Sequence, residues 1–472
     1  MASRLAGQAV PARLPDRPRV LLVRPDHLGD LLMSAPAVEL LRKMLPHAHL
    51  TMMVGPWGVE IARRDPLLDE VLTCPFPGFT REPKGSAVAP YRLLWKTARE
   101  LRRGRYDAVL LLRFDHWWGA WMAALAGTPV RVGHGVPECL PFLTHVVEPV
   151  GRGPLACGAR WCETQTETVG RCGGGPARSP SPDVGGEAAP ACAALPGAGA
   201  PNAHRASPGC GMLPTSGHWV EQSLAVAEEL LVAWGVGGNA GFSSSLGRAH
   251  EGLKSLPRID SEPAGSLPRK EFAGVPRGLG LRFALTEEDE AKARRLVVEL
   301  GLSTDRPLVA FHPGTGSPLK LWLEERWVGL GRTLASRGAQ VVVTGSPAES
   351  RGAERIAGAI PDAHSLAGRT DLGSLAALFR RCNVVVGVDS GPLHLAVAVG
   401  VSTVHLFGPT DPALFGPWGD PALHRVVKGE WPGAPCGRLD LAPPSGEYAG
   451  CMESISLDRV VAECEELLWG RR

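Results

Sequence analysis

The chain has 472 residues, and its 50 basic and 48 acidic side chains leave a net charge of +2. This length suits two or three domains. Because the charges nearly balance, no overall field would attract nucleic acid, and we expect no nucleic-acid partner. Hydrophobic residues make up 44% of the chain but aromatic residues only 6%, a composition that favours alternating strands and helices.

Targeting and redox signals are absent from the sequence pattern. No run of apolar residues has the length of a signal peptide or of a membrane-spanning helix, so we expect a cytoplasmic protein, with contact to a membrane surface left open. Zinc-type C-x-x-C spacing is also absent, and we interpret the cysteines between residues 151 and 217 as reduced thiols in a loop: Cys157, Cys162, Cys172, Cys192 and Cys210.

The first part of the chain alternates between strand and helix patterns. After a flexible arm over residues 1–18, RVLLVRPDHLGDLLMSAPAV predicts a strand, a polar turn with Gly29 and an amphipathic helix. A second strand ends at Gly55, a helical pattern covers 91–102, and a third strand covers 106–112. This alternation predicts a Rossmann-like domain with a parallel sheet over residues 19–236.

Two irregular stretches follow. Residues 151–217 are rich in Gly, Pro, Ala and Ser, which predicts a disordered low-complexity insertion. A helical pattern returns over 217–236. Residues 237–304 are predicted as a loose linker that ends in a connecting helix over 286–302, with Thr286 as its cap and Gly301 at its close.

A second alternating unit occupies residues 305–455, and a closing helix covers 456–472. We therefore predict an α/β fold with two facing Rossmann-like domains and a low-complexity insertion. Each buried strand of the second unit ends in a polar or glycine-bearing loop, and such loops bind ligands in open α/β sheets. A ligand cleft between the two domains follows from this arrangement.

Two loops of the second unit are candidates for nucleotide binding. HPGTGSPLKLW (312–322) lacks the G-x-x-x-x-G-K-[ST] pattern of a Walker nucleotidase, yet Thr315 and Lys320 suit a diphosphate, the alternative being a solvated lysine beside a turn. In TGSPAES (344–350), Glu349 would accept hydrogen bonds from a ribose or lie on a solvated helix start.

Two further loops follow in the same unit. Residues 384–394 read VVVGVDSGPLH, and Asp389, Ser390 and Gly391 predict a helix cap that doubles as an anion-binding terminus. His394 on that helix is either packed or part of the site. GPTDP (408–412) is interpreted as a tight turn.

The order and spacing of these motifs resemble glycosyltransferase family 9, the ADP-heptose:lipopolysaccharide heptosyltransferases. The matching segments are VLLVRPDHLGDLLMSAPAV, HWVE from His218, FHPGTGSPLKLW, VTGSPAES, VVGVDSGPLHLA and LFGPTDP. The resemblance covers most of 19–235 and 305–470 and leaves the insertion unmatched. It implies the two-domain glycosyltransferase B architecture, with 19–236 on the acceptor side and 305–455 binding the nucleotide sugar.

The resemblance also implies residue roles. The acid of the G-D pair, Asp30, is the expected catalytic base, whereas Asp26 falls outside the pair. We assign the stabilisation of the departing ADP to Lys320, Thr315 and the helix start at Ser390 and Gly391. No metal and no cofactor is expected. The donor site as predicted contains Thr315, Lys320, Glu349, Asp389, Ser390, Gly391 and His394.

The acceptor side departs from the family pattern at LLRFDHWWGAWMAALAG (111–127). We place His27, Arg113 and Trp117 there, and the tryptophans at 117, 118 and 121 either pack in the core or line an acceptor groove. The expected partners are ADP-heptose and a lipopolysaccharide core or lipid A acceptor, with peripheral contact to the cytoplasmic face of the inner membrane left open.

The leading hypothesis is therefore an inverting, metal-independent transfer of heptose to the lipopolysaccharide inner core. Two alternatives stay open: a sugar-nucleotide epimerase of the same fold, and a non-catalytic protein that binds sugar nucleotides. No redox role is assigned to Cys436 or Cys451.

Overall fold

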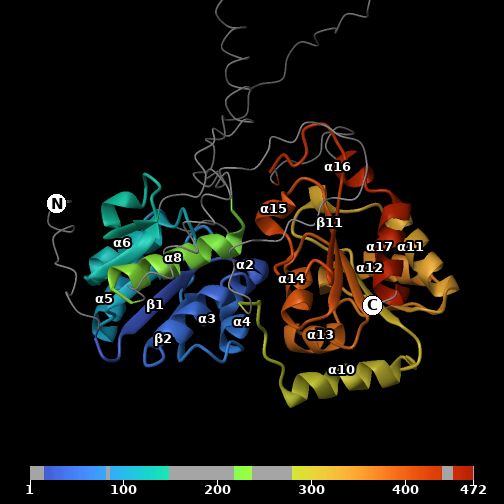
Figure 1. Cartoon of the computed structure of the whole chain (residues 1–472), viewed down its shortest axis with the longest axis horizontal. Helices are drawn as coiled ribbons and strands as arrows, with labels where there is room; N and C mark the ends of the chain where they lie inside the picture. The colour runs from blue at the N-terminus through green and yellow to red at the C-terminus, as the bar shows by residue number, and fades with distance from the viewer. Residues whose placement is uncertain are drawn as a thin grey trace, which may run out of the picture. The chain divides into compact units, whose positions relative to one another are not determined.

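The computed structural model describes residues 15–80, 86–147, 217–236, 279–437, 439 and 450–470 (Figure 1). All of these residues belong to one compact unit of the chain. The predicted arm up to residue 14, the insertion up to residue 216 with its five cysteines, and the linker up to residue 278 lie outside the described residues.

The first domain is built on a six-stranded parallel sheet. Its order is β3-β2-β1-β4-β5-β6, the strand order of the dinucleotide-binding Rossmann fold. The strands are β1 (Arg19–Arg24), β2 (His49–Val54), β3 (Glu70–Thr73), β4 (Ala108–Leu111), β5 (Val130–His134) and β6 (His145–Val147).

Helices cover both faces of this sheet (Figure 1). Leu21 and Val23 of β1 pack in a core cluster with residues of α5 and α6, while Val20 and Leu22 on the opposite face are equally buried. Burial on both faces explains why β1 is a continuous apolar run. The helical segments are α2 (Leu28–Leu32), α3 (Ala35–Met44), η1 (Pro56–Gly58), α4 (Val59–Arg63), α5 (Ala89–Gly104), α6 (Trp117–Ala126), η2 (Leu140–Phe142) and α8 (Trp219–Ala233).

The second domain repeats the same topology. Its parallel sheet has the order β12-β11-β10-β7-β8-β9, which is the same strand order once the strands are counted from β7. The strands are β7 (Leu308–His312), β8 (Gln340–Val343), β9 (His364–Ser365), β10 (Val384–Val388), β11 (Ser402–Phe407) and β12 (His424–Lys428).

One core of this domain is aromatic. Trp327 is buried, and its ring centroid lies 5.3 Å from that of Phe311 on β7 and 5.1 Å from that of Trp322. The helical segments are η3 (Pro318–Lys320), α11 (Glu324–Ser336), η4 (Pro347–Glu349), α12 (Ser350–Gly358), α13 (Leu372–Phe379), α14 (Gly391–Ala398), α15 (Pro412–Phe415), α16 (Gly450–Glu453) and α17 (Leu457–Trp469).

The predicted fold class, two parallel-sheet α/β domains, is confirmed. The connecting helix is α10 (Glu287–Glu299), with Thr286 in a capping box and Gly301 at φ +64° after its end. The predicted mid-chain and closing helices correspond to α8 and α17, while the domain boundaries stay predictions. Within the described residues, no helix combines the length and the apolar character needed to cross a membrane.

Asp289 fixes the start of α10. It is buried, it accepts hydrogen bonds from the backbone N–H (2.8 Å) and hydroxyl (2.7 Å) of Thr286, and its Oδ1 lies 3.1 Å from Nη2 of Arg64. The hydrogen bond from Arg64 is the main reason that the pKa of Asp289 falls to about 2.

Asp289→Asn should therefore lower the free energy of unfolding by about 2 kcal/mol at pH 7. Because the pKa is depressed in the folded state, this stabilisation is present above about pH 4 and disappears as the pH falls towards 2. Urea unfolding at pH 7 and at low pH measures the difference. Glu287→Gln, at an exposed position of the same helical turn, is the matched control; equal losses for both variants would contradict the assignment.

Candidate functional site

Several of the predicted site residues lie in loops at the point of each sheet where the strand order reverses. In the first sheet β1 and β4 are neighbours, and Asp26 and Arg113 follow them. In the second sheet β7 and β10 are neighbours, and Thr315 and Asp389 follow them. Ligands of open α/β sheets bind at such switch points, outside the carboxyl ends of the strands.

The starts of α2 and α14 lie against each other. A Cβ atom on Gly29 would stand 3.0 Å from Cδ2 of His394, and a Cβ atom on Gly391 would stand 3.0 Å from side-chain atoms of Leu28. Only residues without a side chain permit this approach without displacing a neighbour. The contact brings Asp30, which follows Gly29, close to Ser390, which precedes Gly391.

The Asp30 carboxyl group is partly buried and has charges of both signs around it. Its side chain is 31% exposed, and Arg24 Nη2 lies 3.8 Å from Oδ1. Burial raises the pKa of Asp30 to about 6, and the charges of Asp26 and Asp389 add to this, while Arg24 and Arg113 oppose it. A carboxyl group with such a pKa can exchange a proton near neutral pH.

Asp26 lies in the same turn but has two arginine partners. Arg24 Nε lies 3.0 Å from its Oδ2, and Arg113 Nη1 bonds its Oδ1. Although burial opposes ionisation, the two guanidinium groups hold the pKa of Asp26 below its ordinary value. Asp26 is therefore a fixed negative charge, and the expectation that Asp30 is the better candidate base agrees with this difference.

Arg24 and Arg113 shape the first half of the site. Arg24 is fully buried, and its guanidinium lies 5.2 Å from the ring of Trp219 on α8. Arg113 also pairs with Asp115, whose Oδ2 lies 3.1 Å from Nη2. Sequence reasoning missed Arg24; the signal was an arginine at the end of an otherwise apolar strand.

The remaining acceptor-side candidates separate in the structure. Trp118 packs in the core of the first domain and Trp121 packs against it, whereas Trp117 is exposed, so an acceptor groove at Trp117 stays a prediction. His27 is exposed at the start of α2, with its ring 5.2 Å from that of Trp57.

Lys320 and Asp389 form an ion pair in the second half of the site. Lys320 Nζ lies 3.1 Å from Asp389 Oδ2, and the Thr410 hydroxyl donates to the same oxygen at 2.7 Å. Asp389 therefore positions Lys320. Thr410 was missed because GPTDP was interpreted only as a tight turn.

Three polar atoms around this pair are buried and have no hydrogen-bond partner among the described residues. They are the Thr315 hydroxyl, the Ser390 hydroxyl and Nδ1 of His394. Ser390 is the N-cap residue of α14, but its side chain makes no capping hydrogen bond, so the predicted side-chain cap is wrong. Buried polar groups are rarely left unpaired in proteins, and these three suit a ligand with many acceptor atoms.

Glu349 is tied to its own helix start. Its Oε2 accepts from the backbone N–H (2.6 Å) and the hydroxyl (2.8 Å) of Ser346. The carboxylate also lies against the 312–322 loop, since a Cβ atom on Gly314 would stand 2.1 Å from Oε1. Its predicted contact with a ribose remains a prediction.

His218 connects α8 with the loop after α15. Its Nδ1 accepts from the backbone N–H of Val220 at 3.2 Å, so Nε2 carries the hydrogen and donates to the Gly416 carbonyl at 3.0 Å. Burial lowers the pKa of His218 to about 4, which keeps the ring neutral. The His-Trp-Val-Glu motif thus has a structural role.

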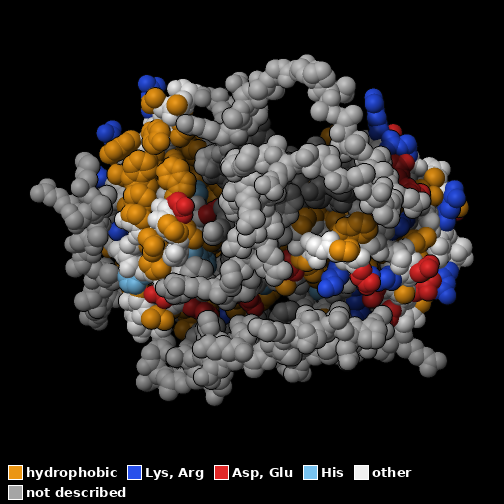
Figure 2. Space-filling view, turned by 90° about the horizontal axis from the view of Figure 1, so that it is seen from above, with side chains coloured by type: hydrophobic (Ala, Val, Ile, Leu, Met, Phe, Trp, Pro, Cys, Tyr) orange, Lys and Arg blue, Asp and Glu red, His pale blue; other side chains and the backbone are white. Residues whose placement is uncertain are grey.

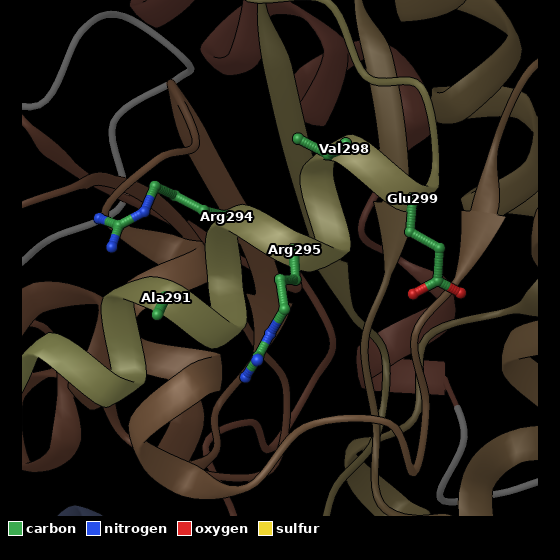
Figure 3. Close-up of a pocket in the computed structure, with 5 residues that line it drawn as sticks. All are labelled: Ala291, Arg294, Arg295, Val298 and Glu299. Carbon is green, nitrogen blue, oxygen red and sulfur yellow. The ribbon is translucent and has the colours of Figure 1, made fainter.

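Outside this site, the described residues form at least one pocket and no candidate metal cluster. No group of three or more His, Cys, Asp or Glu side chains there is arranged to hold a metal ion. A shallow pocket on α10 is lined by Arg294, Arg295, Val298 and their neighbours and contains none of the predicted site residues (Figure 3).

Comparison with known proteins finds a matching family. Residues 270–440 match the family model described as glycosyltransferase family 9 (heptosyltransferase). The match covers just over a third of the chain, and it is to the family that the motifs resemble.

Curated relatives agree with this family. The chain is 33% identical over 160 residues to lipooligosaccharide heptosyltransferase 2 of Haemophilus influenzae, a match that covers 32% of this chain and 46% of the relative. It is 36% identical over 131 residues to lipopolysaccharide heptosyltransferase 1 of Pseudomonas aeruginosa, covering 28% and 36%. The chain thus spans less than half the length of these two relatives.

Solved structures share the fold. A glycosyl transferase family 9 protein from Veillonella parvula superposes with a TM-score of 0.62 at 20% identity, covering 98% of this chain and all of the other. ADP-heptose lps heptosyltransferase II of E. coli gives 0.58 at 19% identity, covering 95% and 98%.

The raised pKa of Asp30 has a consequence for stability. A carboxyl group with a folded pKa of about 6 destabilises the folded state once the pH exceeds its unfolded value of about 4, and this penalty is complete above about pH 6. Asp30→Asn should therefore raise Tm at pH 8 and leave it nearly unchanged at pH 4. Thermal unfolding at both pH values tests this, and a lower Tm for the variant at pH 8 would contradict it.

Proposed function

We propose that this protein is an inverting glycosyltransferase that moves a heptose from ADP-heptose to a lipopolysaccharide core acceptor. The names of the matched relatives support the reaction and the substrate class. The observation that carries the proposal is the meeting of α2 and α14, which brings a carboxyl group with a pKa of about 6 next to a helix start with unpaired polar groups.

Asp30 serves as the general base. An acceptor hydroxyl is a weak nucleophile, and Asp30 takes its proton as the oxygen bonds to the anomeric carbon of the heptose. The bond between that carbon and the diphosphate oxygen breaks in the same step, on the opposite face of the sugar. The product therefore has the inverted anomeric configuration.

The second domain stabilises the leaving ADP. The Gly391 N–H at the positive end of α14 and the ammonium of Lys320 supply positive charge, and the hydroxyls of Thr315 and Ser390 supply hydrogen bonds. Asp389 keeps Lys320 oriented whether or not nucleotide is present. Protein groups thus balance the diphosphate charge, and a chelator should leave turnover unchanged.

Asp30→Asn should reduce kcat by about 10²- to 10⁴-fold while ADP binding stays within about twofold of the original. The wild-type kcat/KM should rise tenfold per pH unit up to about pH 6 and then level off, because the base must be ionised. ADP release from ADP-heptose in the presence of acceptor measures both. Asp26→Asn is unsuitable as a control, because Arg24 and Arg113 would lose their partner; Asp305→Asn, at an exposed position outside the site and without an ion pair among the described residues, is preferable.

The same assay separates the alternatives. Product formation without acceptor would indicate an epimerase, and tight nucleotide binding with no turnover over several acceptors would indicate a binding protein. Unchanged turnover in Asp30→Asn would remove Asp30 as the base.

Lys320→Met should weaken ADP binding by about tenfold or more, since it removes a charge-assisted contact to the diphosphate. Adenosine binding should change little, because adenosine lacks the diphosphate. Isothermal titration with both ligands measures the contrast. Equal losses for ADP and adenosine would mean that the substitution disturbs the domain and that Lys320 does not contact the phosphates.

A further inference from the structure

Aromatic side chains of α5, α6 and η2 form one continuous surface on the first domain. Trp121 lies at its centre, with ring centroids 6.1 Å from Tyr91, 6.4 Å from Trp117 and 5.9 Å from Phe142. Trp95 lies one turn after Tyr91 on α5. We call this the aromatic surface: Tyr91, Trp95, Trp117, Trp121, Leu140 and Phe142.

The aromatic surface is open to solvent. Trp95 is 60% exposed, Tyr91 49% and Trp117 40%. Of the twelve exposed large hydrophobic residues that the structure describes, five lie on α5, on α6, on η2 or directly before α5: Val88, Tyr91, Trp95, Trp117 and Leu140. Figure 2 shows hydrophobic side chains gathered at the end of the view that holds α6 in Figure 1. Contiguous exposure of this kind marks an interaction site.

Basic side chains lie among these aromatic residues. The inner face of α5 buries Leu94, Ala98 and Leu101, while Arg92, Lys96, Arg99 and Arg103 are exposed. Arg92 and Arg99 stand one turn before and after Trp95, on its side of the helix. None of these four basic groups has an ion pair with a described residue, and the nearby acidic groups are Glu100 on α5 and Glu138 before η2.

We propose that the aromatic surface docks on a lipid bilayer that carries anionic headgroups. Tryptophan and tyrosine favour the boundary between headgroups and acyl chains, and a helix with an apolar stripe beside Lys and Arg is typical of segments that lie in that boundary. The cores of protein interfaces are depleted in lysine, whereas here Lys96 follows Trp95 directly, so a protein partner fits less well.

The aromatic surface borders the acceptor side of the candidate site. Trp117 begins α6 two residues after Asp115, which pairs with Arg113, and Arg113 bonds Asp26 in the Asp30 turn. Docking through this surface would hold the first domain at the bilayer, where an acceptor with a lipid anchor resides. This step goes beyond the proposed function, and membrane binding itself requires no turnover.

Vesicle flotation with the full chain tests the proposal. The protein should float with vesicles of phosphatidylcholine and phosphatidylglycerol in equal parts and remain unbound with phosphatidylcholine alone. The double variant Tyr91→Ala/Trp95→Ala should bind the anionic vesicles at least about tenfold more weakly. Arg92→Gln/Arg99→Gln should lose about fivefold per charge and show a smaller dependence on salt.

A matched control lies on α10, where Arg294, Arg295 and Val298 combine exposed basic and apolar side chains (Figure 3). Arg294→Gln/Arg295→Gln/Val298→Ala should float like the wild type. The proposal fails if the wild type does not bind anionic vesicles, if Tyr91→Ala/Trp95→Ala binds as well as the control, or if light scattering shows a dimer that this variant dissociates. Vesicle binding without any turnover would leave the docking surface standing and overturn only the proposed function.

Discussion

The contact between the first turns of α2 and α14 is the constraint on which the candidate site depends. Gly29 lies against the ring of His394, and Gly391 lies against Leu28, so neither position has room for a side chain unless a neighbour shifts. The two sheets each place their switch-point loops at the carboxyl ends of the strands, and this contact brings the loops before α2 and α14 together. Without it, Asp30 and Ser390 would belong to separate sites.

The two aspartates of the first turn show how environment divides chemically identical groups. Asp26 is buried between Arg24 and Arg113 and stays ionised. Burial is the main reason that the pKa of Asp30 rises, the charges of Asp26 and Asp389 add to it, and Arg24, with Nη2 3.8 Å from Oδ1, opposes it together with Arg113. The negative charge of Asp26 therefore helps to raise the pKa of Asp30. Arg24 and Arg113, which pair with Asp26, act in the opposite direction.

The sequence predicts the fold well because its signals are local. Apolar runs that end in Gly or Asp define the strands, and Thr286 with Asp289 three residues later marks the start of α10. The strand order could not be read from these patterns, since it depends on which strands pair across the sheet. The low-complexity segments are recognisable by composition, but composition says nothing of their contacts.

The sequence predicts which residues belong to the candidate site, but it does not predict the hydrogen bonds and ion pairs that connect them. Lys320 is predicted from the sequence as a diphosphate ligand, a role that stays a prediction, whereas its pairing with Asp389 and the bond from Thr410 depend on how three loops pack together. Ser390 was expected to cap α14, a rule that holds for isolated helices, whereas its hydroxyl is left without a partner. The capping rule therefore fails at Ser390, where the unpaired hydroxyl is available to a ligand.

Under the proposed function, Lys320 interacts with two anions, the Asp389 carboxylate and the diphosphate. Its ammonium is already bonded to Asp389, so a bound diphosphate shares this charge and does not receive it alone. Such sharing limits the affinity for ADP, because Asp389 already neutralises part of the Lys320 charge before the nucleotide binds. The same pairing keeps the long side chain oriented, which reduces the conformational entropy lost on binding. Under the proposed function, the Gly391 N–H and the unpaired hydroxyls of Thr315 and Ser390 supply the remaining stabilisation when charge develops on the leaving oxygen, because Pro392 has no N–H and the Leu393 N–H donates to the Ser390 carbonyl.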